Sequence, residues 1–310
     1  MKPRVLLTGK NGQVGSELQR LLGNSSELRA LDRQELDLSN SKDIRDAIRR
    51  FHPHIIINAA AYTAVDRAES EQAAARIVNA DAPTVMAEEA KAIGAALIHY
   101  STDYVFDGSK RSPYREDDPP CPISVYGESK LAGEQGIQNV GGAYLIFRTE
   151  WVYALRGKNF LCTIVRLASQ QEQLRIVADQ RGAPTWSREI ASATAKIVSK
   201  EWRRSNGVSP FAACSGIYHM TASGQASWYE FATAIVDEAR RIPPDSVWLK
   251  ETTSGRPLVV QRIVPIATAD YPTPARRPSY SVLSNARLEK TFDVRLPDWR
   301  LQLHSAVAAG

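Results

Sequence analysis

Apolar residues in the first half of the chain fall into short runs separated by longer segments with helical spacing. The short runs are partly β-branched, which is typical of buried strands, and they cover residues 4–8, 28–31, 54–61, 95–100 and 143–148. Apolar residues three and four positions apart predict helices at residues 41–51, 69–94, 188–202, 228–240 and 284–292. Another helix is expected after the loop at 107–124, with Ser124 as its N-cap. Strands that alternate with helices predict an α/β fold with a parallel, doubly wound sheet.

A glycine-rich loop joins the first predicted strand to a helix. Gly9, Gly12 and Gly15 have the spacing G-x-x-G-x-x-G. Glycine permits a tight turn, lets the backbone approach a pyrophosphate and lets the helix pack close to the strand. The N-terminus of the helix then offers free N–H groups to the phosphates. This context favours a dinucleotide site over a purely structural turn.

An acidic and a basic residue follow the second predicted strand. Asp32 lies roughly 20 residues beyond the glycine loop, where a carboxylate can bind the adenine ribose hydroxyls. Arg33 can instead meet a 2′-phosphate, so the pair leaves the choice between NAD and NADP open. A third interpretation is that both are solvated loop charges.

The pattern changes after residue 150, and this change suggests two domains. We expect a Rossmann-type dinucleotide-binding domain over residues 1–150, to which the chain returns at about 174–200, with 174–177 as a further strand of the sheet. Residues 151–173 and 201–310 then form a smaller mixed α/β lobe that binds substrate.

Tyr126 and Lys130 stand four residues apart in a predicted helix, so their side chains lie on one face. A phenol has a pKa of about 10 and needs a positive neighbour to exchange protons near neutrality. The spacing is common by chance, and its meaning depends on context. Thr102 and Asp103 supply that context, because they follow a predicted strand where open α/β sheets bind ligands.

Charge and composition exclude several other classes of protein. The 310 residues carry a net charge of +5, but the basic residues are dispersed, so we expect no nucleic-acid partner. Three widely spaced cysteines, Cys121, Cys162 and Cys214, indicate a reducing compartment rather than disulfides or a metal knuckle. We see no apolar run of membrane-spanning length and no signal-like segment, and we expect a cytoplasmic protein that binds no membrane.

Two further features are interpreted as structural. His219 lies in an apolar, strand-like segment and is expected to be a hydrogen-bonded core histidine rather than a catalytic one. Trp228 and Tyr229 are expected to pack a helix of the lobe onto the core.

Taken in order, these motifs resemble the extended short-chain dehydrogenase/reductases that act on nucleotide sugars, and more narrowly the dTDP-4-dehydrorhamnose reductases. The resemblance covers nearly the whole chain. The segments that carry it are residues 9–15, 58–66, 101–106, 126–134, 148–153, 182–185 and 275–278.

The resemblance implies an activity and a set of site residues. That family reduces the C4 ketone of dTDP-4-dehydro-L-rhamnose with NADPH or NADH, in nucleotide-sugar biosynthesis for cell-surface polysaccharide. Tyr126 would donate the proton, Lys130 would hold the nicotinamide ribose and lower the phenol pKa, and Thr102 would bind the carbonyl or the tyrosine. The residues implied for cofactor binding are Gly9, Gly12, Gln13, Val14, Gly15, Asp32, Asp37, Leu38, Ala61, Tyr62, Thr63, Tyr100, Tyr126 and Lys130. The residues implied for substrate binding are Thr102, Asp103, Trp151 and Arg277.

Departures from the family pattern affect three expectations. Asp103 is followed by Tyr104 rather than the glutamate of related dehydratases, which argues for simple reduction. Some members form dimers around Mg²⁺, but only Glu17 matches a ligand, with Arg188 and Ser192 at the other positions. Two missing oxygen ligands leave little for a hard cation, so no metal residue is assigned beyond Glu17 and the survival of a Mg²⁺ site stays open. Ser279 and Tyr280 replace a small polar residue and so alter the expected nucleotide contacts.

Two other functions stay open at this stage. A nucleotide-sugar 4-epimerase would share Tyr126 and Lys130 but retain tightly bound NAD⁺. A dinucleotide-binding regulatory subunit would not need Thr102, Tyr126 or Lys130 at all. Oligomeric state is not fixed by the sequence, and both a monomer and a homodimer fit.

Overall fold

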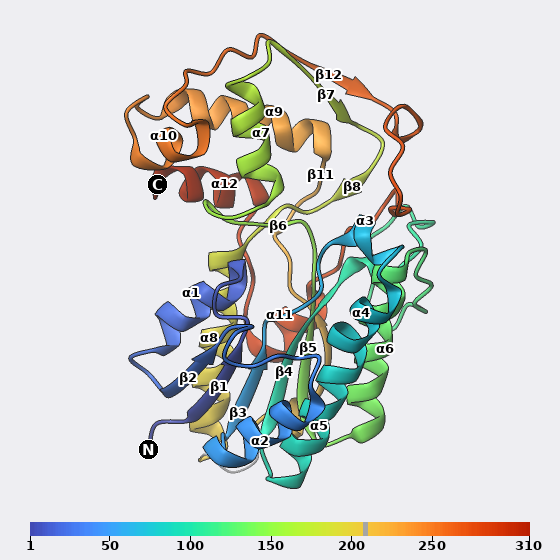
Figure 1. Cartoon of the computed structure of the whole chain (residues 1–310), viewed down its shortest axis with the longest axis vertical. Helices are drawn as coiled ribbons and strands as arrows, with labels where there is room; N and C mark the ends of the chain where they lie inside the picture. Colours follow the sequence, from blue (N-terminus) through green and yellow to red (C-terminus); the bar gives the residue numbers. More distant parts are fainter. Residues whose placement is uncertain (207–209) are drawn as a thin grey trace.

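The computed structural model describes residues 1–206 and 210–310. In Figure 1 a parallel sheet with its helices occupies the lower part, and a smaller lobe lies above the sheet. The fold class predicted from the sequence, a doubly wound α/β sheet with a mixed α/β lobe, is confirmed.

The central sheet has the strand order β10-β5-β4-β3-β1-β2, and each neighbouring pair is parallel. Its strands are β1 (Arg4–Thr8), β2 (Glu27–Leu31), β3 (Ile55–Asn58), β4 (Ala96–Thr102), β5 (Ala143–Thr149) and β10 (Gly216–His219). The order reverses direction between β1 and β3. In open α/β sheets a ligand binds beyond the carboxyl ends of the strands at such a reversal.

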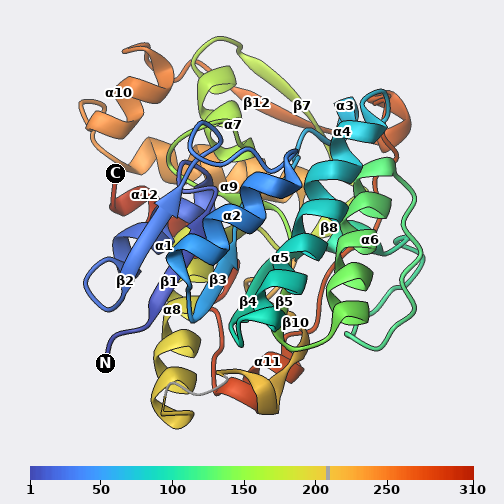
Figure 2. The same ribbon diagram turned by 60° about the horizontal axis from the view of Figure 1, so that its bottom comes forward.

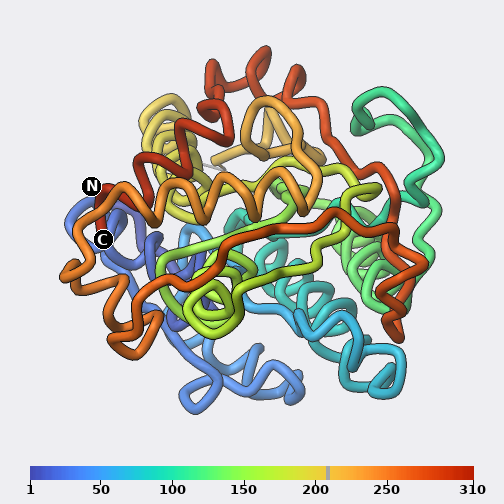
Figure 3. The backbone as a smooth tube through the Cα atoms, turned by 90° about the horizontal axis from the view of Figure 1, so that it is seen from above, coloured from blue at the N-terminus to red at the C-terminus, as the bar shows by residue number. Residues whose placement is uncertain are grey.

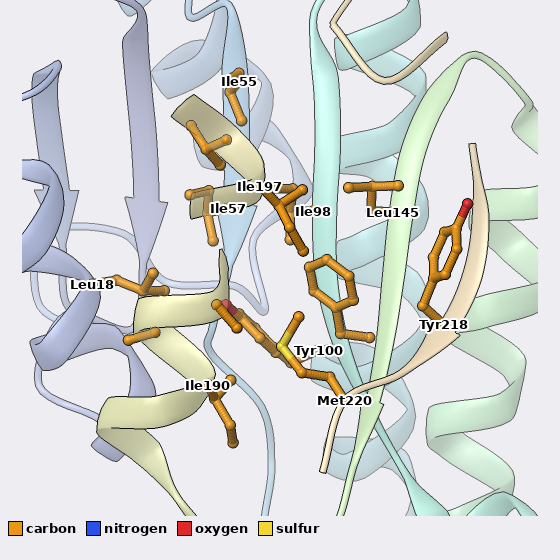
Figure 4. Packing of buried hydrophobic residues seen from close by; sticks show 14 of the residues in the cluster. Leu18, Ile55, Ile57, Ile98, Tyr100, Leu145, Ile190, Ile197, Tyr218 and Met220 are labelled. Carbon is orange, nitrogen blue, oxygen red and sulfur yellow. The ribbon is translucent and has the colours of Figure 1, made fainter. Parts of the chain in front are cut away.

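Alternate residues of each strand face opposite layers of helices, which explains the continuous apolar runs. Leu7, Ile57 and Ile98 face α1 (Gln13–Leu22), α8 (Ser187–Arg204) and α11 (Ala286–Phe292). Figure 4 shows Leu18, Ile190 and Ile197 against these strands. Leu6 and Ile56 face the other layer, α2 (Ser41–Phe51), α5 (Ala82–Ala92) and α6 (Val125–Val140), which lie side by side in Figure 2.

The helix predicted over residues 69–94 is interrupted. The structure has α3 (Val65–Ala68), α4 (Gln72–Arg76), a π-helical turn (Ile77–Asp81) and then α5. Asn79 in the π turn accepts from the Tyr62 N–H at 2.8 Å and donates to the Tyr62 carbonyl at 3.0 Å. Wide turns of this kind are frequent at functional sites, and this one fixes the backbone of a predicted cofactor residue.

The lobe has its own core and its own small sheets. Its helices are α7 (Phe160–Ala168), α9 (Trp228–Arg241), α10 (Val247–Thr253) and α12 (Trp299–Ala308). Its strand pairs are β7 (Gln173–Val177) with β12 (Arg262–Ile266), β8 (Arg181–Gly182) with β11 (Ala226–Ser227), and β6 (Val152–Tyr153) with β9 (Thr185–Trp186). Figure 3 looks down on this lobe, with β7 and β12 side by side.

The chain crosses between the two parts differently from our expectation. The prediction that residues 174–177 return to the central sheet is wrong, because β7 pairs in parallel with β12 in the lobe. The sheet is instead extended by β10, which comes from the range expected to form the lobe. The return at α8 does occur, since Ile190 and Ile197 belong to the core of the central sheet.

Candidate active site

The predicted site residues gather around one cavity between the carboxyl edge of the sheet and the lobe. Its volume is about 1830 Å³. Gly15 is buried inside α1. The other predicted cofactor and substrate residues all line the cavity: Gly9, Gly12, Gln13, Val14, Asp32, Asp37, Leu38, Ala61, Tyr62, Thr63, Tyr100, Thr102, Asp103, Tyr126, Lys130, Trp151 and Arg277.

The glycine loop forms a cradle in which side chains would collide. Gly9 has φ +76°, and a Cβ atom there would lie 2.8 Å from the Ala60 nitrogen. A Cβ atom on Gly15 would lie 2.1 Å from the Gly9 carbonyl oxygen. No side chain caps the N-terminus of α1 at Gly12, so its first N–H groups face the cavity edge, as a pyrophosphate site requires. The loop therefore fits a dinucleotide.

Asp32 is held as a carboxylate at the other end of the loop. Its Oδ1 accepts from the N–H groups of Gln34 at 3.0 Å and Glu35 at 3.2 Å, and its Oδ2 accepts from Asn11 at 3.1 Å. Burial works to raise the pKa of Asp32, but these N–H groups and the nearby Lys10 lower it below the ordinary value. Arg33 lines the same end of the cavity, so both an anion and a cation stand near the expected adenosine.

Tyr126 and Lys130 lie in the first turns of α6. The Ser124 hydroxyl caps this helix by accepting from the Gly127 N–H, as predicted. Lys130 is 1% exposed, and its Nζ donates to the Tyr100 carbonyl at 2.6 Å and lies 3.0 Å from His99 Nε2. Burial lowers the pKa of Lys130 to about 8, although Glu134 opposes this shift.

The expectation that Lys130 lowers the phenol pKa is not met. Burial raises the pKa of Tyr126 to about 12, with the Thr102 hydroxyl lowering it and the Asp103 carboxylate raising it. The reason is geometric, since the Lys130 ammonium is directed at the β4 backbone and at His99. Tyr126 is therefore a neutral acid at ordinary pH.

A buried polar chain behind Lys130 was missed by sequence reasoning. The Thr8 hydroxyl donates to Asn58 Oδ1 at 2.7 Å, and Asn58 Nδ2 lies 3.1 Å from His99 Nδ1. Burial, and the Lys130 charge, hold the pKa of His99 well below its ordinary value. The only available signal was that Thr8 and Asn58 end neighbouring strands.

Tyr100 contributes to the site through its backbone. Its ring belongs to the core on the α8 side, and its hydroxyl lies 2.7 Å from the Thr194 hydroxyl. Its carbonyl is the acceptor that fixes Lys130. The sequence marked Tyr100 as a cofactor residue but did not indicate this role.

Thr102 and Asp103 end β4 beside Tyr126. The Thr102 hydroxyl donates to Asp103 Oδ1 at 3.0 Å. Asp103 is 2% exposed, and burial raises its pKa. Glu150 follows β5, is 1% exposed and lines the same cavity. Burial and the Asp103 charge raise the pKa of Glu150 well above its ordinary value.

Trp151 joins the sheet to the lobe. It has a left-handed backbone (φ +46°), and its indole stacks on Trp228 with ring centroids 3.4 Å apart and planes 7° apart. A Cβ atom on Gly182 would lie 2.5 Å from the Trp151 ring, so glycine is needed on its other side. Trp228 was expected only to pack a helix, but it also lines the cavity.

Arg277 reaches the cavity from the C-terminal third of the chain. Its Nη2 lies 2.9 Å from Asp66 Oδ2, and its Nη1 donates to Thr273 Oγ1 at 2.5 Å and to the Ala275 carbonyl at 3.1 Å. Three more basic residues from the lobe, Arg156, Lys158 and Arg175, line the same cavity. Tertiary folding alone brings them there, and no local sequence pattern marks them.

Glu17 is paired with cations rather than set in a cluster of oxygen ligands. Its Oε2 accepts from Arg20 Nη2 at 3.1 Å and from Arg188 Nε at 3.3 Å. Over residues 1–206 and 210–310 no three His, Cys, Asp or Glu residues gather as a metal site. These donors do not fit a divalent cation.

Two other features can be placed. His219 is fully buried in β10 beside Arg148, and burial lowers its pKa to about 3. The expectation of a core histidine is confirmed, but the expected hydrogen bonds are not formed, because neither ring nitrogen has a partner among the described residues. Among the described residues, none of the helices has the length and apolar character needed to span a bilayer.

Three features together define the class of protein: the glycine cradle, the Tyr126–Lys130 pair beside Thr102, and the lobe over the edge of the sheet. The protein is a nicotinamide-dependent oxidoreductase of the extended short-chain dehydrogenase/reductase type. A family model described as RmlD substrate binding domain matches residues 2–310. The chain belongs to the dTDP-4-dehydrorhamnose reductase family.

Individual relatives agree with this family. A dTDP-4-dehydrorhamnose reductase from Burkholderia thailandensis is 50% identical over 298 residues, covering 96% of this chain and 95% of the relative. The one from Escherichia coli (strain K12) is 41% identical over 301 residues, covering 96% and 94%. A crystal structure of dTDP-4-dehydrorhamnose reductase from Bacillus anthracis in complex with NADP superposes with a TM-score of 0.87 at 33% identity and full coverage of both chains.

A more distant structure shares the fold alone. The UDP-glucose 4-epimerase of Thermus thermophilus, in complex with NAD, has a TM-score of 0.74 at 20% identity and covers 98% of both chains.

Proposed function

We propose that this protein reduces the C4 ketone of dTDP-4-dehydro-L-rhamnose to give dTDP-L-rhamnose. The observation that carries the proposal is the single cavity in which Thr102, Tyr126 and Lys130 lie between the glycine loop and the lobe. Membership in the dTDP-4-dehydrorhamnose reductase family supports the choice of substrate.

Reduction of a ketone needs a hydride and a proton. The reduced nicotinamide supplies the hydride when it is bound. Tyr126 gives its phenolic proton to the developing alkoxide, and a phenol pKa of about 12 keeps that proton in place until the alkoxide forms. Lys130 is anchored by the Tyr100 carbonyl and His99, and its remaining N–H is the donor for the nicotinamide ribose. Thr102 and Asp103 orient the sugar beside the phenol.

We further propose that NADH and NADPH both bind. The ionised Asp32 would accept hydrogen bonds from an unmodified ribose, whereas Arg33 offers a cation to a 2′-phosphate. The N–H groups at the start of α1 would hold the pyrophosphate. Arg277, Arg156, Lys158 and Arg175 are the cations proposed for the diphosphate of the sugar nucleotide.

The test is the oxidation of NADH and NADPH, followed by absorbance, with dTDP-4-dehydrorhamnose as substrate. We expect turnover with both cofactors and no loss of rate on addition of EDTA, because Glu17 is neutralised by Arg20 and Arg188. Absence of turnover in a folded protein that binds the cofactor would contradict the proposal and favour a regulatory subunit. Tightly retained NAD⁺ in the purified protein would favour an epimerase.

A further inference from the structure

Lys130 lies at the end of a buried chain of hydrogen bonds that runs from Thr8 through Asn58 and His99. None of these four residues is more than 2% exposed. The last link joins His99 Nε2 to Lys130 Nζ over 3.0 Å. Which of the two nitrogens donates in this link depends on the protons further back along the chain.

The backbone of Ala60 fixes the orientation of the Asn58 amide. Asn58 Oδ1 accepts from the Ala60 N–H at 3.2 Å and from the Thr8 hydroxyl at 2.7 Å. A backbone N–H can only donate, so turning the amide by half a rotation would set two donors against each other. The Asn58 Nδ2 group therefore faces His99, with 3.1 Å between Nδ2 and the ring nitrogen Nδ1.

This orientation of Asn58 fixes the tautomer of His99. Asn58 Nδ2 carries only donors, so His99 Nδ1 must accept from it. Burial, and the Lys130 charge, keep the ring neutral by holding the pKa of His99 well below its ordinary value. A neutral imidazole has one N–H and one acceptor nitrogen, so the proton is on Nε2. His99 thus presents a donor to Lys130.

A donor at this place favours the uncharged form of Lys130. An ammonium has three donors and no acceptor, whereas an uncharged amine has a lone pair. The amine can accept from the His99 Nε2–H and donate to the Tyr100 carbonyl at 2.6 Å. An ammonium would face the His99 donor, and reversing the His99 tautomer would only set Nδ1–H against Asn58 Nδ2. The uncharged amine still has one N–H left for a ligand.

The other charges around Lys130 do not replace this contact. Glu134, on the same helix, favours the ammonium, but its carboxylate is bound by Arg148 of β5 at 2.6 Å, with both side chains buried. Tyr126 is a neutral phenol and Asp103 lines the same cavity, and among the described residues neither is hydrogen-bonded to Lys130. The pKa of Lys130, lowered to about 8 by burial, agrees with a site that disfavours the charge.

We propose that His99 is a positioning residue for Lys130: held by Asn58 as the Nε2–H tautomer, it donates to the Lys130 amine and favours the uncharged form. Through the contact of Lys130 with the nicotinamide ribose, His99 then sets the pH above which NADH is bound less strongly. This second step rests on the function proposed above, whereas the tautomer and the Lys130 charge do not.

The first measurement is the tautomer of His99 in the wild-type protein. Nitrogen-15 NMR of protein labelled at histidine distinguishes a protonated ring nitrogen from an unprotonated one, and the His99 signals are those that change most in Lys130→Met. We expect Nε2 to be protonated and Nδ1 to be unprotonated at neutral pH. This measurement needs no substitution at His99, so it decides the matter even if such a variant does not fold.

The second measurement is the titration of Lys130 itself. Carbon-13 NMR of the lysine Cε atoms follows it, and the Lys130 signal is the one absent from Lys130→Met. In His99→Gln the amide oxygen can accept from the ammonium, so we expect the Lys130 midpoint to rise by at least about one pH unit. The rise in the Kd of NADH should move to higher pH by the same amount. His219→Gln is the matched control, because it removes another fully buried histidine of the sheet, and it should change neither midpoint.

Protonation of His99 at Nδ1 in the wild type would overturn the proposal, and so would an unchanged Lys130 midpoint in a folded His99→Gln variant. The expected Cε midpoints together with a Kd of NADH that is independent of pH would support the role of His99 and remove the ribose contact. Absence of turnover with dTDP-4-dehydrorhamnose would overturn the proposed function and leave both NMR results unaffected, so the two failures are distinguishable.

Discussion

Tyr126 is the residue on which the proposed reduction depends most. Replacing it with phenylalanine keeps the ring that packs edge-on against Tyr104 but removes the proton donor. Loss of a positioned acid costs about 10²–10⁴ in rate, so kcat of Tyr126→Phe should fall by that factor while NADH binding stays nearly unchanged. Turnover assays and NADH fluorescence titrations check both parts.

Tyr144→Phe is the matched control, since Tyr144 starts β5 at the other end of the sheet. A Tyr126→Phe variant as active as this control would rule out Tyr126 as the acid.

The proposed contact of Lys130 with the nicotinamide ribose predicts that cofactor affinity depends on pH. Its pKa of about 8 lies below the value of a free lysine, because the buried site disfavours the charge. Lys130 therefore loses its proton as the pH rises through about 8, and its N–H groups then bind the ribose less strongly. We expect the Kd of NADH to rise between pH 7 and 9.5 in the wild type. Lys130→Met should bind weakly at every pH, with a flat profile over this range.

At the scale of single elements, β10 carries an acid-sensitive group. The folded-state pKa of His219, about 3, lies below its unfolded value near 6.5, so the unfolded state binds more protons between these pH values. Stability is therefore lost as the pH falls from about 6.5, by up to roughly 1.4 kcal/mol per pH unit for one such histidine.

His219→Gln cannot bind that proton, so its free energy of unfolding should depend less steeply on pH. Urea unfolding at pH 7, 6 and 5 measures the slope. His52→Gln, at an exposed helix end, is the control and should keep the wild-type slope. Equal slopes in all three proteins would contradict the role assigned to burial.

The start of α1 has no room for a single added methyl group. Gly15→Ala would place a Cβ atom 2.1 Å from the Gly9 carbonyl oxygen, and this contact can be relieved only by moving the loop. We expect NADH binding to be lost and the protein to be destabilised by about 1–3 kcal/mol. Ser16→Ala in the same helix should change neither NADH titration nor urea unfolding by a comparable amount.

The local sequence pattern predicted helices and strands correctly where a single signal dominated. The apolar run at 55–58 and the Ser124 cap of α6 gave the strand and the helix start directly. The helix over 69–94 was misjudged, because alanine-rich sequence does not reveal that Asn79 needs a wide turn to reach Tyr62. The partner of β7 was misjudged for another reason. Sheet membership depends on which strand is near in space, and β12 lies far along the chain.

At the scale of the whole molecule, the site is assembled from distant segments. Motifs indicated the half on the sheet, from the glycine loop to Tyr126 and Lys130. Trp228 and Arg175 have no sequence pattern that marks them, because only the docking of the lobe brings them to the same cavity. The directions of the pKa shifts could not be predicted from the sequence either, because they depend on burial and on where the Lys130 ammonium points.

Substitution of Arg277 tests whether the last third of the chain binds the sugar nucleotide. Its guanidinium lines the cavity from a segment that pairs with Asp66 of α3. Arg277→Ala should raise KM for the sugar nucleotide about tenfold, the effect of losing one charge-assisted contact, and leave the Kd of NADH unchanged. Arg276→Ala removes the exposed neighbouring arginine and should leave both constants near the wild type. A weaker NADH complex in Arg277→Ala alone would place this arginine at the cofactor instead.

The stacked indoles of Trp151 and Trp228 provide an intrinsic spectroscopic probe of the position of the lobe relative to the sheet. Two indole rings that are stacked 3.4 Å apart with nearly parallel planes couple electronically, and the coupled pair produces a bisignate band in the circular dichroism spectrum. One ring follows β5 and the other begins α9, so the intensity of that band depends on how closely the lobe sits on the sheet. Closure around ligands is thus measurable in the unlabelled protein, independently of catalysis.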